Sequence, residues 1–550
     1  MRWMCALLLL PLALWAQARP DESCSISGQV TNAATGEPVR RALVYLRRID
    51  MSPGVTNVQV TQSGTTDAAG RFALSGIAPG KYRLSAERSG FLTTQYGSRG
   101  PNKAGTLITL EPGQKSSDMA MRLTPHGVIS GRVLDEEGEP VPNANVQVLR
   151  QQYMQGRKEL VRTGGGNTND LGEYRVFGLP PGRYFVSADI RANPVAPQTG
   201  EEYVSTFFPR ATDAAAAAPL DMAAGAQLRN IDVVLAKMHT VIVTGRAVSE
   251  IRPPAAPGEN AHRNYINLML SARNTMIVGT GFTRGASVNP DGIFEFRGVA
   301  PGSYFVIAQV NLPGKNFAAR TAIQVSNSNI EGISLTIRGG VTVNGRVRVE
   351  GETTTSLTGL RVTLQPAEAG IVFGPFPTQQ VKEDGSFQLD DVGADRYTLA
   401  VNNLPEGFYL KSVRTANLDV LADGLEIAAG SPAPLDLVVS SKAGQISGTV
   451  LDPRTQKAAA GMIVVLVPQE KDRRNRESFY RNATTDAAGG FAFKSLTPGE
   501  YRVYSWEEAD LGAWMDPDFM KSQESRGEAV SIQEGARQAV QVNLIPADSQ

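Results

Sequence analysis

The sequence is poor in the residues that many enzymes use for catalysis. It has 2 cysteines, 3 histidines and 4 tryptophans among 550 residues. It also carries no net charge, because 54 basic residues balance 54 acidic ones. This balance leaves no basic field that would attract nucleic acid, so we expect no nucleic-acid partner.

Cysteine is too scarce to stabilise the fold through disulfides. Cys5 lies in an N-terminal apolar run, and Cys24 is the one cysteine after it. A single cysteine cannot form an intramolecular disulfide, so stability must come from packed hydrophobic cores. The charged residues at positions 21 and 22 argue against lipidation of Cys24.

Long hydrophobic runs are missing beyond the N-terminus. Residues 1–18 combine Arg2, a short apolar run and Ala-Gln-Ala at 16–18, which predicts a secretory signal peptide cleaved after Ala18. The run is too short for a membrane span. We therefore expect a mature chain without a transmembrane segment that is secreted to the periplasm, the cell surface or the medium.

Residue patterns that bind metals or activate nucleophiles are also missing. His126, His239 and His262 lie far apart, and none belongs to a His-x-x-Glu or His-Glu-x-x-His pattern. The sequence has no Gly-x-Ser-x-Gly elbow. The turns at Asp170 and Asp384 offer too few oxygen ligands for calcium. We expect no catalytic residue, no metal and no cofactor, and we interpret the protein as a non-enzyme.

Glycine and proline are plentiful, at 55 and 33 residues, and many of them belong to a recurring hairpin. Residues 65–84 show its parts: an Asp-x-x-Gly turn, a Phe-x-Leu strand, a Pro-Gly turn and a Tyr-x-Leu strand. Constant spacing in five copies indicates one repeated structural unit. The copies are 67–82, 170–184, 291–304, 384–397 and 486–501, and their turn glycines are Gly70, Gly80, Gly172, Gly182, Gly292, Gly302, Gly385, Gly489 and Gly499.

The chemistry of the hairpin predicts its local structure. Asp and Gly favour a turn, and strict alternation in the next strand indicates one buried face. The Pro-Gly pairs fit a type II turn. The tyrosine that follows can bury its ring while its hydroxyl keeps a partner. The fourth copy has Ala394-Asp395 instead of Pro-Gly, so we expect another turn type there.

A second signature opens each repeat: an alternating strand with a central glycine, at Gly28, Gly131, Gly245, Gly345 and Gly448. Glycine inside a strand suggests a bulge or a close backbone approach. Short strands at regular spacing predict an all-β chain of five tandem antiparallel β-sandwich domains. Short joints between them favour a semi-rigid rod. The expected segments are 24–124, 125–238, 239–338, 339–441 (divergent) and 442–546.

The Ile-Ser-Gly-x-Val opening, the Asp-x-Gly-x-Phe turn and the Pro-Gly-x-Tyr hairpin together resemble the carboxypeptidase regulatory-like domain. The resemblance covers residues 24–546. It implies a transthyretin-like (prealbumin-like) β-sandwich, related to collagen-adhesin B-type repeats and to the carbohydrate-binding-like fold. In metallocarboxypeptidases this module is an accessory domain without catalysis.

Aromatic side chains give the best hypothesis for a ligand site, because apolar ring faces stack on sugars. Tyr504, Trp506 and Trp514 lie together in the fifth segment, although core packing is the alternative interpretation. A second candidate is the group Tyr203, Phe207 and Phe208.

The function that we predict is a non-catalytic, secreted binding or structural protein of the bacterial cell envelope. Its partner would be a polysaccharide, such as peptidoglycan, or an envelope protein. The alternatives are a dedicated carbohydrate-binding protein that uses the aromatic residues of the fifth segment, and an accessory scaffold of a peptidase.

Overall fold

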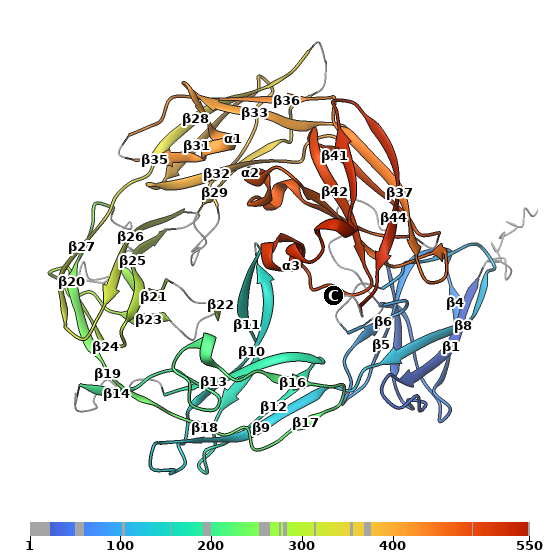
Figure 1. The fold of residues 1–550 in the computed structure, drawn as a ribbon, viewed down its shortest axis with the longest axis horizontal. Helices are drawn as coiled ribbons and strands as arrows, with labels where there is room; N and C mark the ends of the chain where they lie inside the picture. The colour runs from blue at the N-terminus through green and yellow to red at the C-terminus, as the bar shows by residue number, and fades with distance from the viewer. Residues whose placement is uncertain are drawn as a thin grey trace, which may run out of the picture. The chain divides into compact units, whose positions relative to one another are not determined.

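The computed structural model describes residues 23–547, with gaps at 50–59, 99, 102–104, 155, 191–199, 252–264, 274–276, 279–282, 313–314, 352–355, 368–375, 429 and 487. The predicted signal peptide and His262 lie outside the described residues. Nearly all regular structure is β-strand (Figure 1), so the all-β prediction is confirmed. The chain forms two compact units. The first comprises residues 1–128, 177–181 and 222–227, and the second comprises residues 129–176, 182–221 and 228–550.

The first unit contains two packed sheets, with strand orders β4-β1-β8 and β3-β2-β5-β6, and β7 also pairs with β5. Their inner faces enclose one core that includes Ile26, Val44, Phe72 and Leu84. The strands are β1 (Cys24–Asn32), β2 (Leu43–Arg48), β3 (Val60–Thr65), β4 (Arg71–Ile77), β5 (Gly80–Glu87), β6 (Thr94–Gln95), β7 (Ile108–Leu110) and β8 (Lys115–Leu123).

The next strands of the chain build the sheets of the second and third expected segments. They are β9 (Gly127–Leu134), β10 (Asn145–Met154), β11 (Arg157–Asn167), β12 (Glu173–Leu179), β13 (Gly182–Asp189), β14 (Glu201–Tyr203), β15 (Thr206–Phe207), β16 (Leu220–Met222), β17 (Gln227–Leu228), β18 (Val233–Val234), β19 (Lys237–His239), β20 (Val241–Ser249), β21 (Asn267–Ala272), β22 (Ile277–Val278), β23 (Thr283–Ala286), β24 (Ile293–Val299), β25 (Gly302–Leu312), β26 (Lys315–Val325) and β27 (Ile330–Ile337).

The last two segments repeat the pattern and add three short α-helices. The strands are β28 (Val341–Val349), β29 (Arg361–Pro366), β30 (Thr378–Gln380), β31 (Ser386–Val392), β32 (Asp395–Asn402), β33 (Tyr409–Thr415), β34 (Leu418–Asp419), β35 (Leu425–Ile427), β36 (Leu435–Ser440), β37 (Gly444–Asp452), β38 (Lys457–Ala458), β39 (Ile463–Pro468), β40 (Arg481–Thr484), β41 (Gly490–Leu496), β42 (Gly499–Trp506), β43 (Glu528–Ile532) and β44 (Arg537–Ile545). The helices are α1 (Val420–Asp423), α2 (Lys471–Arg474) and α3 (Pro517–Lys521).

One strand pairing in these sheets differs from the prediction. The opening strand β1 is antiparallel to β4, as expected, but parallel to the closing strand β8. The opening strands β20, β28 and β37 have the same two kinds of neighbour. A parallel pair needs a long connection, and here most of a segment lies between the two strands. The sandwich is therefore confirmed, but its first sheet is mixed rather than purely antiparallel.

The central glycine of the opening strand marks a close backbone approach, as predicted. A Cβ atom on Gly28 would lie 2.0 Å from the Met119 carbonyl oxygen of β8. On Gly448 it would lie 2.1 Å from the Val540 carbonyl oxygen of β44. Only glycine allows the two parallel strands to come this close.

The hairpin tyrosines bury their rings, and their hydroxyl groups donate to the backbone four residues upstream. Tyr82 donates to the Ala78 carbonyl at 2.7 Å, and Tyr501 donates to the Thr497 carbonyl at 2.8 Å. This prediction is confirmed. The type II turn is wrong, because Gly80 has a φ of 153° rather than about +80° and already begins β5.

Within the second unit, the hairpin of β10 and β11 contacts the fifth segment, where the Lys158 Nζ lies 3.5 Å from an Asp516 carboxylate oxygen. The rod and the division into five domains stay predictions.

Candidate functional site

In the second and fifth segments, the chain that follows the tyrosine strand packs on the outer face of the second sheet. We call the chain that follows the tyrosine strand the excursion. Its described residues are 88–98, 100–101 and 105–107 in the first segment, 200–219 in the second and 507–527 in the fifth. The sandwich is thus a common scaffold, and the excursions are the parts that differ between segments.

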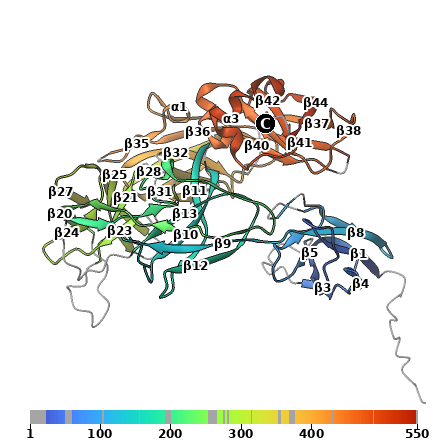
Figure 2. The ribbon, with the colours of Figure 1, turned by 60° about the horizontal axis from the view of Figure 1, so that its bottom comes forward.

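In the fifth segment the excursion seals the outer face with aromatic rings. Tyr504 and Trp506 of β42 stack at 5.3 Å between ring centroids, and Trp506 stacks on Trp514 at 6.4 Å. Trp506 also contacts Phe519 of α3, which lies beside β42 (Figure 2). Trp506 is 0% exposed and Trp514 is 4% exposed.

The predicted sugar-binding group is therefore brought together, but inside the protein. Its rings form a hydrophobic cluster with Val465 and Met520. Burial raises the pKa of the Tyr504 hydroxyl above its usual value. A stacking platform needs exposed ring faces, so this structure favours the alternative interpretation of core packing.

The second aromatic candidate is not a continuous surface either. Phe207 is buried in a cluster with Leu149 and Leu160. Tyr203 is half-buried, and the Lys237 ammonium lies over its ring at 4.8 Å. Because this face of the ring is occupied by a cation, it does not offer a free platform for a sugar.

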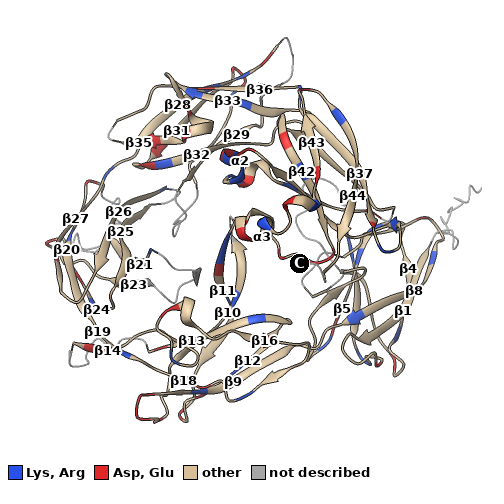
Figure 3. Cartoon of the chain, in the orientation of Figure 1, with Lys and Arg blue, Asp and Glu red and all other residues tan. Residues whose placement is uncertain are grey.

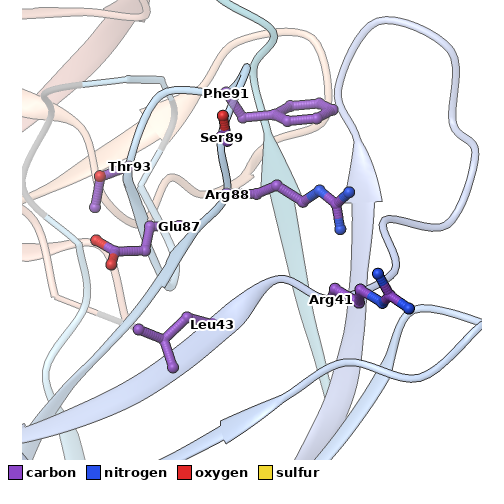
Figure 4. A pocket seen from close by; sticks show the side chains of 7 residues that line it. All are labelled: Arg41, Leu43, Glu87, Arg88, Ser89, Phe91 and Thr93. Carbon is purple, nitrogen blue, oxygen red and sulfur yellow. The ribbon is translucent and has the colours of Figure 1, made fainter.

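The first segment differs, because its excursion leaves an open pocket of about 410 Å³ (Figure 4). The lining residues come from the start of β2, the end of β5 and the loop after it: Arg41, Leu43, Glu87, Arg88, Ser89, Phe91 and Thr93. Figure 4 shows Arg41, Arg88 and Phe91 extending to one side of the loop, and Glu87 and Thr93 on the other.

The two arginines of this pocket lack partners. Within the part of the chain that the structure describes, neither guanidinium group forms an ion pair or a side-chain hydrogen bond. The Arg88 Nη1 atom is buried and has no acceptor. Buried donors without acceptors are rare in proteins and costly.

Arg41 has an unusual backbone, with a φ of 55°. The same turn occurs in the second and fifth segments, where the left-handed residue is Asn143 with a φ of 56° or Gly461 with a φ of 70°. Asparagine and glycine tolerate this region, whereas most other residues pay a penalty of about 1–2 kcal/mol.

A buried threonine holds this turn in all three segments. Thr66 Oγ1 donates to the Val39 carbonyl at 2.6 Å and accepts from the Ala42 amide at 2.8 Å. Thr168 and Thr485 make the same pair of bonds. Our sequence reasoning missed this residue, although a threonine precedes the turn aspartate by one or two positions in these copies.

The loop that carries the pocket is fixed to the end of the first sandwich. The Leu92 amide donates to the Thr124 carbonyl at 2.9 Å, and the His126 amide donates to the Gly90 carbonyl at 3.1 Å. These bonds lie in the first unit and give the loop a defined conformation.

His126 and Cys24, which the sequence analysis singled out, contact neighbouring protein groups. The His126 ring lies 5.9 Å from the Phe177 ring, and its Nδ1 accepts from the Gly178 amide. The Cys24 thiol is buried and donates to the Glu111 carbonyl at 3.0 Å. No metal-binding group of His, Cys, Asp or Glu side chains occurs among the described residues. No helix in the described ranges is long and apolar enough to span a membrane.

Charged residues of both signs are interspersed over the chain (Figure 3). At the border of the fourth and fifth segments, the Lys411 Nζ binds Glu350 at 2.6 Å and Glu534 at 2.7 Å. Its ammonium lowers the pKa of both carboxyl groups through hydrogen bonds. The Glu534 carboxylate also accepts from the Tyr409 hydroxyl at 2.7 Å.

Comparison with known families agrees with the repeated sandwich. Residues 25–124 and 128–205 match the model of the carboxypeptidase regulatory-like domain. These two stretches are similar to that domain. The BOS complex subunit NOMO3 of Homo sapiens is 30% identical over 220 residues, which are 39% of this chain and 16% of that protein. The chain thus matches only a small part of that relative's length.

Solved structures with a distant likeness include a TIE protein and a pilin subunit. The Bacillus anthracis TIE protein has a TM-score of 0.17 at 10% identity, with 76% of this chain and 73% of that chain covered. BcpA, the major pilin subunit of Bacillus cereus, has a TM-score of 0.15 at 11% identity, with 76% and 100% covered. At these TM-scores the likenesses carry no argument about function.

Proposed function

We propose that this chain is a non-catalytic, secreted binding protein of the bacterial cell envelope, in which β-sandwiches present variable excursions to a glycan or a protein. The observation that supports this proposal most is the combination of a similar sandwich core with excursions that differ between the first, second and fifth segments. Functional residues are commonly found on loops that a rigid scaffold positions.

The chemistry of the described residues agrees with binding rather than catalysis. Buried polar residues such as Thr66 and Tyr82 are used for backbone hydrogen bonds, and the open pocket offers two arginines, one glutamate and an aromatic ring. Pockets that combine apolar walls with a few polar groups are typical of ligand sites.

A pull-down with residues 19–550 tests the proposal. The purified chain is incubated with insoluble polysaccharides, peptidoglycan and detergent-solubilised envelope proteins, and retained material is compared with beads alone. We expect saturable retention by one of these classes. Absence of retention by all of them, together with turnover of a peptide or glycoside library, would overturn the proposal in favour of an enzyme or its scaffold.

A further inference from the structure

The pocket of the first segment combines three observations that point to one kind of ligand. Its walls contain two guanidinium groups without partners, one buried nitrogen without an acceptor, and a left-handed arginine. We infer that this pocket binds an oxyanion, a carboxylate or a phosphate ester, carried by a glycan. The identity of the carrier rests on the proposed function, whereas the anion site itself does not.

The missing partners of Arg41 and Arg88 are the first step of the argument. A guanidinium group presents several donors in a fork that matches carboxylate and phosphate oxygens. Neither side chain uses its donors within the described part of the chain. An oxyanion bound in the pocket would supply acceptors for the guanidinium donors of Arg41 and Arg88 that line it.

The backbone of Arg41 is the second step. Its amide donates to the Thr66 carbonyl at 2.9 Å, as the Asn143 amide does to the Thr168 carbonyl in the second segment. The two turns are therefore equivalent, and asparagine would suit this position better than arginine. Local strain is often found where a side chain has a function, and the strained residue here lines the pocket.

The third step concerns the size and polarity of the ligand. A volume of about 410 Å³ is larger than an inorganic ion needs. Phe91 supplies a half-buried ring beside Arg88, and Ser89 and Thr93 supply exposed hydroxyl groups. An acidic sugar matches this combination, because it has apolar ring faces, hydroxyl groups and one negative charge.

Calorimetric titration of residues 19–550 at low salt tests the inference. The probes are glucuronate for the carboxylate, glucose 6-phosphate for the phosphate ester, and glucose as the uncharged control. We expect one of the two anions to bind and glucose not to bind. A preference for glucuronate assigns a carboxylate, and a preference for glucose 6-phosphate assigns a phosphate. Equal binding of glucose, or no binding of either anion, overturns the inference.

Three variants locate the binding. Arg88→Gln and Arg41→Asn should each weaken anion binding about 10-fold or more, because each removes a charge-assisted hydrogen bond. Arg40→Asn is the matched control, since Arg40 is exposed like Arg41 but does not line the pocket. Equal loss with Arg40→Asn, or no loss with Arg88→Gln, would overturn the assignment to this pocket.

A polysaccharide arm separates this inference from the proposed function. Retention on polygalacturonate that disappears with Arg88→Gln supports both. Binding of glucuronate without retention on any polysaccharide supports the pocket and contradicts the glycan carrier. Retention that Arg88→Gln leaves unchanged contradicts the pocket and leaves the proposed function standing.

Discussion

The first and fifth segments use the same sandwich, but their outer faces end in different environments. In the fifth segment, residues 507–527 cover Trp506 of β42 with Trp514 and Phe519, and a sealed cluster results. In the first segment, the equivalent chain leaves a pocket with Arg41 and Arg88. The excursion therefore decides whether this face is a sealed core or carries an open pocket.

The aromatic content of a segment is therefore a poor guide to its binding surface. Tryptophan contributes a large apolar area, which is most useful where it is removed from water. A buried guanidinium nitrogen without a partner, such as Arg88 Nη1, is more informative, because a folded protein normally satisfies such a group. Ligand binding by the aromatic rings of the fifth segment would contradict this difference between the two segments. A purely structural role of those rings would support it.

The largest loss of stability is expected from Trp506→Ala. This side chain is fully buried and contacts three aromatic rings, so truncation should lower the free energy of unfolding by about 3–5 kcal/mol. Urea denaturation monitored by circular dichroism measures the change. Leu511→Ala in the same excursion is the control, since Leu511 is 68% exposed and should change stability little. A stable variant that had lost binding to a polysaccharide would restore the sugar-platform hypothesis.

A smaller loss of stability is expected from replacing the buried threonine that holds the turn, which is Thr66 in the first segment and Thr485 in the fifth. Thr485→Val removes the acceptor of the Met462 amide and the donor to the Ala459 carbonyl. Because both backbone groups would stay without a partner, we expect a loss of about 1–3 kcal/mol. Thr66→Val should cost a similar amount in the first segment. The exposed Thr65→Val gives the background for a threonine substitution beside the turn. A loss no larger than that background would show that the hydroxyl bonds do not hold the turn.

A smaller change in stability, of opposite sign in the first and second segments, is expected at the left-handed turn residue. Arg41→Asn should stabilise the protein by about 1 kcal/mol, because asparagine tolerates a positive φ. Asn143→Arg should destabilise it by a similar amount. Thermal unfolding of both variants measures the pair. Destabilisation by Arg41→Asn would mean that this arginine is retained for packing rather than for a ligand.

Much of the scaffold could be predicted from the sequence, because its signals are local. The spacing of Asp67, Gly70 and Tyr82 fixes two turns and the strand between them, and the central glycine of the opening strand indicates a close approach. The parallel pairing of β1 with β8 could not be predicted, because no local signal connects strands so far apart in sequence. The burial of Trp506 and the opening at Arg88 depend on how an excursion folds onto a distant strand. Sequence patterns of turns and alternation do not contain that information.

The smallest effect concerns pH and the charged group around Lys411. Its ammonium holds the pKa values of Glu350 and Glu534 below the usual glutamate value near 4.3. A carboxyl group with a lowered pKa in the folded state contributes stability above its unfolded pKa, and this contribution is lost as the pH falls through the folded pKa. The wild type should therefore lose slightly more stability between about pH 5 and pH 3 than Lys411→Met does. The difference should be small and should shrink in high salt, because these side chains are solvent-accessible. Melting curves at several pH values measure it, and parallel curves for the two proteins would show that this ion cluster contributes nothing to folding.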